Sequence, residues 1–216
     1  MENLLIVRGI VLKHAPVGDY DWTVTIFTAD RGKITAFAKN ARRPGVKLSG
    51  CVEPFCFGTF KIFVGKNSYT IVEADIENFF EGFRQDLEGA LYGTFFLELV
   101  SFYTRENNED VMLLNLLYIS LKALLNKKIP NRLVRCIFEL RTLQVEGEYP
   151  GIPANRVLND STKYALNYIT ECPLEKLYTF NVTEDVLLEL ESVSAEYRKR
   201  FIDRPIKSLE MLEAFL

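Results

Sequence analysis

The sequence predicts an α+β protein in which a small five-stranded β-barrel is followed by an all-α helical domain. The first 80 residues consist of short β-branched and aromatic runs separated by glycine-containing turns. After residue 80 the apolar residues change to the 3.6-residue spacing of helices. With 216 residues and 48% hydrophobic residues, the chain has enough apolar material for two cores. We therefore expect domains at residues 1–80 and 81–216.

Five strands are expected in the first domain. The runs that predict them are Ile6–Leu12, Thr23–Thr28, Ile34–Ala38, Phe55–Val64 and Tyr69–Asp75. Polar turns separate neighbouring strands, as at Asp30–Lys33 and Gly65–Asn67. So many short strands with no room for a long helix favour a closed or partly closed barrel such as the OB-fold, which commonly binds oligonucleotides.

The second domain is expected to hold five helices. The segments with helical periodicity are Leu87–Tyr103, Asp110–Asn126, Arg132–Gly147, Thr183–Phe201 and Ser208–Phe215. Gly147 and the nearby Pro150 end the third helix, and Thr183 is suited to cap the fourth. Between these two points the residues from Pro150 to Phe180 show little periodicity, so we expect an irregular segment there.

Charge is distributed unevenly along the chain. The formal net charge is −3, but residues 1–80 hold 10 basic and 8 acidic side chains, so the helical half carries the excess of acids. One short stretch contains six cations and no acid: Arg31, Lys33, Lys39, Arg42, Arg43 and Lys47. Such a stretch can be an ordinary solvated surface, or it can neutralise nucleic-acid phosphates without reading sequence. Tyr20 and Trp22 are the nearby aromatic residues that we expect to stack on unpaired bases.

Enzyme motifs are missing from the sequence. There is one histidine, His14, and there is no phosphate-binding loop, dinucleotide fingerprint or zinc-protease motif. The four cysteines form no C-x-x-C pair, so we expect neither a bound metal nor another cofactor. The first residues lack the features of a signal peptide, and no apolar run is long enough to span a bilayer. These features favour a non-catalytic cytoplasmic protein.

The helical half offers a candidate protein-binding site. Arg132 and Arg135 lie on one expected helix with Phe138 and Leu140. An apolar floor with a basic rim could hold an acidic peptide tail that ends in an aromatic residue.

Several motifs along the chain resemble the RecO family of bacterial recombination mediators. The first strand contains Gly9–Leu12, an acid follows at Asp19, and Thr28–Lys33 and Lys39–Arg42 stand where the family has a T-x-x-x-G-[KR] turn and a basic "KGAR" loop. Asn40 replaces the usual glycine of that loop. Further similar segments are Val52–Phe55, Val72–Ile76, Phe138–Leu140 and Lys207–Glu213. The order and spacing of these motifs cover the whole chain.

The resemblance implies an OB-fold packed on a helical domain that acts in DNA repair. The family binds single- and double-stranded DNA, anneals complementary strands, and works with RecR. It also contacts the C-terminal tail of single-stranded-DNA-binding protein and so helps to load RecA. Carried onto this sequence, the resemblance implies DNA contacts at the six cations named above and a partner-tail site at Arg132 and Arg135. It also implies a place on the bacterial nucleoid.

Two other functions fit the same residues. The barrel could bind RNA, or the chain could be a protein–protein adaptor without affinity for nucleic acid. The sequence also departs from the family at one place: many members carry four zinc-binding cysteines after a "GY-P" segment, whereas Gly147–Pro150 is followed by no such cluster and Cys172 stands alone. One thiolate cannot build a tetrahedral zinc site, so we expect no zinc.

Overall fold

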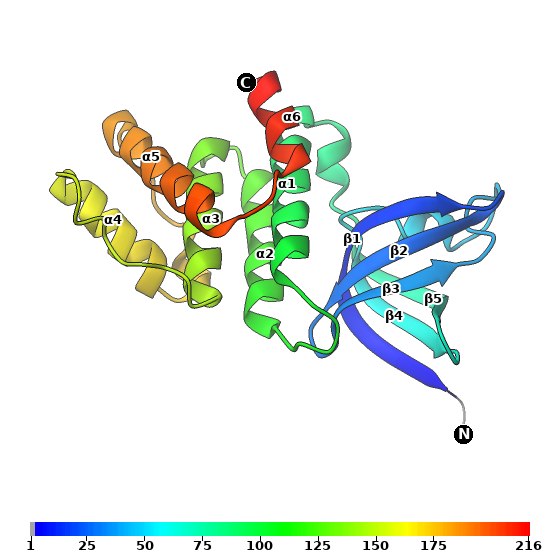
Figure 1. The fold of residues 1–216 in the computed structure, drawn as a ribbon. Coiled ribbons are helices and arrows are strands. Elements are labelled where there is room, and N and C mark those ends of the chain that lie inside the picture. Colours follow the sequence, from blue (N-terminus) through cyan, green and yellow to red (C-terminus); the bar gives the residue numbers. More distant parts are fainter. Residues whose placement is uncertain (1–2) are drawn as a thin grey trace. The chain divides into compact units, whose positions relative to one another are not determined.

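The computed structural model describes residues 3–216, which fold into β-strands followed by helices (Figure 1). The described residues form two compact units. The first contains the chain up to Glu81 together with Leu97–Leu114, and the second contains Gly82–Phe96 together with Asn115–Leu216. The predicted order of a barrel followed by helices is confirmed, while the domain boundary near residue 80 stays a prediction.

Five strands close into a barrel. They are β1 (Leu4–Val17), β2 (Asp21–Thr28), β3 (Gly32–Ala38), β4 (Phe57–Val64) and β5 (Tyr69–Asn78). The strands are hydrogen-bonded in the order β1-β2-β3-β5-β4, and only the β3–β5 pair is parallel within the described chain. The long β1 closes the barrel because it pairs with β2 along most of its length and with β4 through Leu4–Ile10 (Figure 1). This is the expected OB-fold.

Buried and exposed residues alternate along the strands, and the buried ones form the barrel core. In β3, Ile34, Ala36 and Ala38 are buried while the residues between them are more exposed. The same inward positions on the other strands supply Val24, Ile26, Phe60 and similar side chains, so one apolar cluster fills the interior. The pairing register shifts at two places between β4 and β5 and at one place between β1 and β2. Irregularities of this kind allow strands to bend, which closure of a small barrel requires.

The turn between β2 and β3 is fastened to the loop that follows the first helix, α1 (Leu87–Tyr103). The Lys33 amide donates to the Arg105 carbonyl at 3.0 Å, and the Asn107 amide donates to the Arg31 carbonyl at 2.9 Å. Gly32 has a φ of +60°, and a Cβ there would lie 2.1 Å from the Arg105 oxygen. Only glycine fits this contact.

The rest of the described chain is mainly helical. The helices are α1, α2 (Val111–Leu124), α3 (Asn131–Val145), α4 (Asp160–Glu171), α5 (Glu184–Phe201) and α6 (Lys207–Phe215), with short 3-10 turns at Ser49–Cys51, Glu81–Arg84 and Leu174–Lys176. Asp86 caps α1, because its carboxylate accepts the Gly89 amide at 3.1 Å. None of the helices among the described residues is long and apolar enough to cross a membrane.

Helices α3, α4 and α5 pack against one another. α3 is buried over most of its length and stacks Phe138 on Phe96 of α1, with ring centroids 4.0 Å apart. Arg141 of α3 is also buried, and its guanidinium donates to the Ile169 carbonyl at 3.1 Å and to the Thr170 carbonyl at the end of α4. It thereby satisfies carbonyls that a helix terminus leaves unpaired.

The segment at 150–180 differs from the irregular stretch that the sequence predicts, because it contains the twelve-residue helix α4. The side chain of Asn159 caps this helix by accepting the Ser161 amide at 2.9 Å. The buried face consists of Thr162, Ala165, Leu166 and Ile169, which have the spacing of one helical face. A threonine and an alanine at two of these positions weaken the hydrophobic signal, which explains the wrong prediction.

Candidate nucleic-acid interface

Four of the six predicted cations lie on the loop that follows β3. Lys39, Arg42, Arg43 and Lys47 are all exposed there. The loop backbone is held against the turn between β1 and β2, since the Asn40 amide donates to the Asp21 carboxylate at 2.7 Å and the Arg42 amide donates to the Tyr20 carbonyl at 2.9 Å. Asn40 adopts a φ of +56°, a conformation that asparagine tolerates better than most residues. It can therefore replace the glycine of the related loops.

Two arginines of this loop lie over aromatic rings. The Arg43 guanidinium is 4.2 Å from the centre of the Tyr20 ring, and the Arg42 guanidinium is 5.2 Å from the centre of the Trp22 ring. Trp22 is also stacked on His14, with ring centroids 4.0 Å apart. Cation–π contacts orient a guanidinium but leave its N–H groups able to bind an anion. We call Lys39, Arg42, Arg43, Lys47, Tyr20 and Trp22 the loop site.

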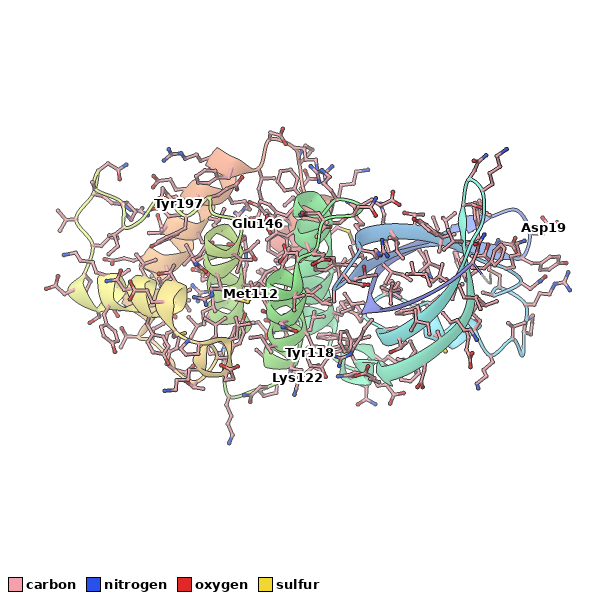
Figure 2. The ribbon with its side chains drawn as sticks, turned by 90° about the horizontal axis from the view of Figure 1, so that it is seen from below. Asp19, Met112, Tyr118, Lys122, Glu146 and Tyr197 are labelled. Carbon is pink, nitrogen blue, oxygen red and sulfur yellow. The ribbon has the colours of Figure 1, made fainter. Side chains whose placement is uncertain are left out.

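Two acids, Asp21 and Asp19, lie close to the loop site, but the cations of the site are not ion-paired with them in the described chain. Within residues 3–216, none of its four cations forms an ion pair with a carboxylate. Tyr20 is 48% exposed, whereas Trp22 is half-buried against the end of the barrel core. Figure 2 shows Asp19 at the tip of the adjoining turn. The arrangement presents positive charge and one accessible ring.

The other two predicted cations lie at the opposite end of β3. Arg31 is exposed in the turn that precedes this strand. The Lys33 ammonium donates to the Ser101 carbonyl at 2.5 Å. β3 has seven residues, so about 20 Å of strand separates this end from the loop site. The structure therefore divides the predicted patch into two groups.

A groove of about 500 Å³ lies beside the second group. It is lined by β3, by the loop between β4 and β5, and by Glu106: Lys33, Thr35, Phe37, Val64, Gly65, Lys66, Asn67, Ser68, Tyr69 and Glu106. The Tyr69 hydroxyl donates to the Glu106 carboxylate at 3.1 Å, and this hydrogen bond raises the pKa of Tyr69. Strand 3 and the loop between strands 4 and 5 are parts of the usual oligonucleotide-binding face of OB-folds.

Outward-facing residues of β3 lie between the two groups of cations, the loop site and the pair Arg31 and Lys33. Lys33, Thr35 and Phe37 alternate with the buried residues of this strand, and Lys39 follows them at the same spacing. The sequence did not identify Lys66 and Asn67 as residues of the site and predicted only that they form a turn between two strands. The parallel pairing of β3 with β5 brings this turn to β3, and no local pattern in the sequence indicates that pairing.

The two arginines of the expected partner-tail site are engaged within the chain. Arg132 of α3 makes ion pairs with Glu184 at 2.7 Å and with Glu191 at 2.6 Å, which raise its pKa. The Arg135 guanidinium lies 5.4 Å from the centre of the Phe95 ring and 3.6 Å from the Glu213 carboxylate. These arginines thus differ from those of the loop site, which have no ion-pair partner in the part of the chain that the structure describes.

Among residues 3–216, no three histidine, cysteine or acidic side chains converge in a way that could hold a metal ion. The cysteines are free thiols, and Cys56, Cys136 and Cys172 are buried. Burial raises the pKa of both Cys136 and Cys172. Neutral, separated thiols of this kind are poor metal ligands.

Comparison with known proteins places the chain in a family. Residues 1–80 match the model described as "Recombination protein O N terminal", and residues 84–152 match "Recombination protein O C terminal". A DNA repair protein RecO from Acetivibrio thermocellus is 30% identical over 98% of this chain and 97% of its own length. The chain belongs to the RecO family. Other RecO relatives are those of Clostridium perfringens, at 27% identity over 95% of this chain and 96% of the relative, and of Caldicellulosiruptor bescii, at 38% over 67% and 59%.

The two RecO family models cover some of the features described above and leave others outside. The N-terminal model covers the whole barrel, including the loop site and the groove beside β3. The C-terminal model covers α1, α2 and α3 and ends at residue 152, before α4 begins at Asp160. Helices α4, α5 and α6 thus lie beyond the RecO models, although the relative from Acetivibrio thermocellus aligns along nearly the whole chain.

Proposed function

We propose that this RecO-family protein is a DNA repair and recombination mediator. It binds single- and double-stranded DNA, anneals complementary strands and, with RecR, helps to load RecA on DNA coated by single-stranded-DNA-binding protein. The observation that carries the proposal is the loop site, where four cations that form no ion pair within residues 3–216 stand beside an exposed ring on an OB barrel. Family membership and the names of the relatives support the repair role.

The geometry suits a strand that runs along β3. Phosphates would contact the loop cations at one end and Lys66 at the other, while Tyr20 and Phe37 offer ring faces to unpaired bases. Contacts to phosphates and to base faces leave the Watson–Crick edges free. A second strand could then pair with the bound one, which is what annealing requires.

Fluorescence anisotropy with labelled single-stranded DNA tests the site. We expect the double variant Arg42→Ala with Arg43→Ala to bind about tenfold more weakly at low salt, because two phosphate contacts are lost. The matched control replaces another adjacent, exposed pair, Lys199→Ala with Arg200→Ala, and should bind as the unchanged protein does. Equal affinity of the loop variant and the control would remove the loop site from the DNA interface.

The single tryptophan supplies a second readout of the same site. Trp22 lies under Arg42 and against His14, so DNA that draws Arg42 onto a phosphate should change its emission. An annealing assay with and without single-stranded-DNA-binding protein and RecR then tests the mediator role. Binding without acceleration of annealing would restrict the function to DNA binding.

RNA binding and a pure adaptor role remain the alternatives. RNA is distinguished from DNA by its 2′-hydroxyl, so competition between RNA and DNA of one sequence separates the first alternative. An adaptor would bind its partners with no affinity for either nucleic acid. The partner tail at Arg132 and Arg135 stays a prediction, and an acidic tail bound there would have to displace Glu184 and Glu191 or Glu213.

A further inference from the structure

The single histidine of the chain lies beside the loop site. His14 is on β1, where it is opposite Val24 of β2, and Trp22 stands two residues before Val24. Residues in this diagonal relation lie on one face of an antiparallel pair, and aromatic side chains there are long enough to touch. The imidazole and the indole are accordingly stacked, with ring centroids 4.0 Å apart and planes within 1° of parallel.

Contacts from the segment before β4 hold the imidazole in place. The Val52 carbonyl can only accept a hydrogen bond, so the proton lies on Nδ1 of His14, which donates to it at 3.2 Å. Nε2 then faces the Glu53 carboxylate at 3.9 Å. The His14 side chain is only 19% exposed. A ring that is covered by its neighbours and hydrogen-bonded at its edge has little freedom to leave the indole.

Trp22 connects His14 to a cation of the loop site. The Arg42 guanidinium lies over the indole, 5.2 Å from the ring centre, and also donates to the Gly18 carbonyl at 3.1 Å. A guanidinium has five N–H donors, so these two contacts orient it without using all of its capacity to bind a phosphate. A side chain that is already ordered loses less conformational freedom on binding. The position of the indole therefore affects how well Arg42 binds an anion.

We propose that His14 is a positioning residue for DNA binding, because it holds Trp22 and Trp22 holds Arg42 where a phosphate can reach it. The inference rests on the proposed DNA binding at the loop site. Without the imidazole the indole loses its parallel neighbour and is free to tilt, so the guanidinium loses its support. Arg43 lies over Tyr20 instead, so its position is independent of His14.

The first test needs no DNA. In NMR spectra of the full chain, the Nε–H signal of Arg42 should be displaced by the ring current of the indole. We expect His14→Ala to remove most of this displacement, and His14→Phe, which keeps a flat ring against the indole, to preserve it. The Arg43 signal should be the same in both variants, because Tyr20 is the ring it lies over. An Arg42 signal that does not move in His14→Ala would overturn the proposal.

Fluorescence anisotropy with single-stranded DNA supplies the second test. His14→Ala should bind about threefold more weakly, because Arg42 must then be ordered on binding. His14→Gln keeps a donor for the Val52 carbonyl but has no ring, so it should bind as weakly as His14→Ala. His14→Phe should bind as the unchanged protein does. The control Tyr164→Ala removes a ring of α4 that is stacked on Tyr168 and exposed, and it should have no effect.

A double-mutant cycle separates positioning from a general loss of structure. In a protein that already carries Arg42→Ala, the change His14→Ala should cost no further affinity, because the residue through which it acts is missing. An equal loss in that background, or failure of His14→Phe to restore binding, would overturn the proposal. If the unchanged protein bound no DNA, the proposed function itself would fail. DNA binding that is insensitive to His14→Ala would contradict this inference alone.

Discussion

Arginine has two different roles in this protein, and its partners decide which. Arg42 and Arg43 lie on aromatic rings and have no carboxylate partner within residues 3–216. Arg132, Arg135 and Arg198 instead hold helices together through glutamates. Composition does not distinguish these roles, because both sets are basic residues near aromatic ones. The sequence therefore identified the loop cations as candidates but could not show that the α3 arginines have acidic partners.

Glu139 should be the most costly of these acids to change. It is 5% exposed, its carboxylate lies 3.4 Å from Arg135 and 2.6 Å from Arg198, and it accepts a hydrogen bond from Ser194. Glu139→Gln removes the buried anion of two largely buried guanidinium groups, Arg135 and Arg198, and leaves them the exposed Glu213 at 3.6 and 3.8 Å. We therefore expect the free energy of unfolding to fall by about 3 kcal/mol. Urea denaturation measures this loss. The exposed Glu210→Gln serves as the control and should change stability by less than about 0.5 kcal/mol.

At the scale of single elements, the ends of helices and strands depend on caps and on strand pairing, and the local sequence shows only part of both. The helix α1 begins and ends at the residues expected from periodicity, whereas α4 was missed because its buried face includes a threonine and an alanine. β1 is longer than expected, since its exposed residues up to Val17 still pair with β2. Backbone pairing with β2, rather than the type of side chain, extends β1 as far as Val17.

The cap of α1 makes a pH-dependent contribution to stability. Burial alone would raise the pKa of Asp86, but hydrogen bonds from Lys127 and from the Gly89 amide lower it below its ordinary value of 3.8. A lowered folded-state pKa stabilises the protein above pH 3.8, and this contribution is lost as the pH falls through the folded value. We expect Asp86→Ala to cost about 1 kcal/mol at pH 7.

Urea unfolding of this variant and the unchanged protein from pH 7 to pH 3 measures the difference. The cost of Asp86→Ala should shrink below pH 3.8 as the carboxyl group of the unchanged protein becomes protonated. The exposed Asp203→Ala should show no such trend. A cost that stays constant down to pH 3 would mean that the ionised carboxylate does not hold the cap.

For the whole molecule, the net charge of −3 conceals a local excess of cations on an otherwise acidic chain. The loop site supplies four cations, so a single strand bound there should release few counterions. Plotting the logarithm of the DNA-binding constant against that of the salt concentration should give a slope of about −3. A slope steeper than about −5 would require cations outside the loop site. The variant Arg42→Ala with Arg43→Ala should roughly halve the slope.

The sequence alone determined the class of fold, the order of barrel and helices, and the candidate cations, because alternation, helical periodicity and charge runs are local properties. The motifs also indicated the family. Only the tertiary structure decided which cations remain without acidic partners, that Arg31 and Lys33 lie a strand's length from the loop site, and that Lys66 lines a groove with β3. These outcomes depend on contacts between residues far apart in the chain, such as Arg132 with Glu191 or β3 with β5, which no local pattern encodes.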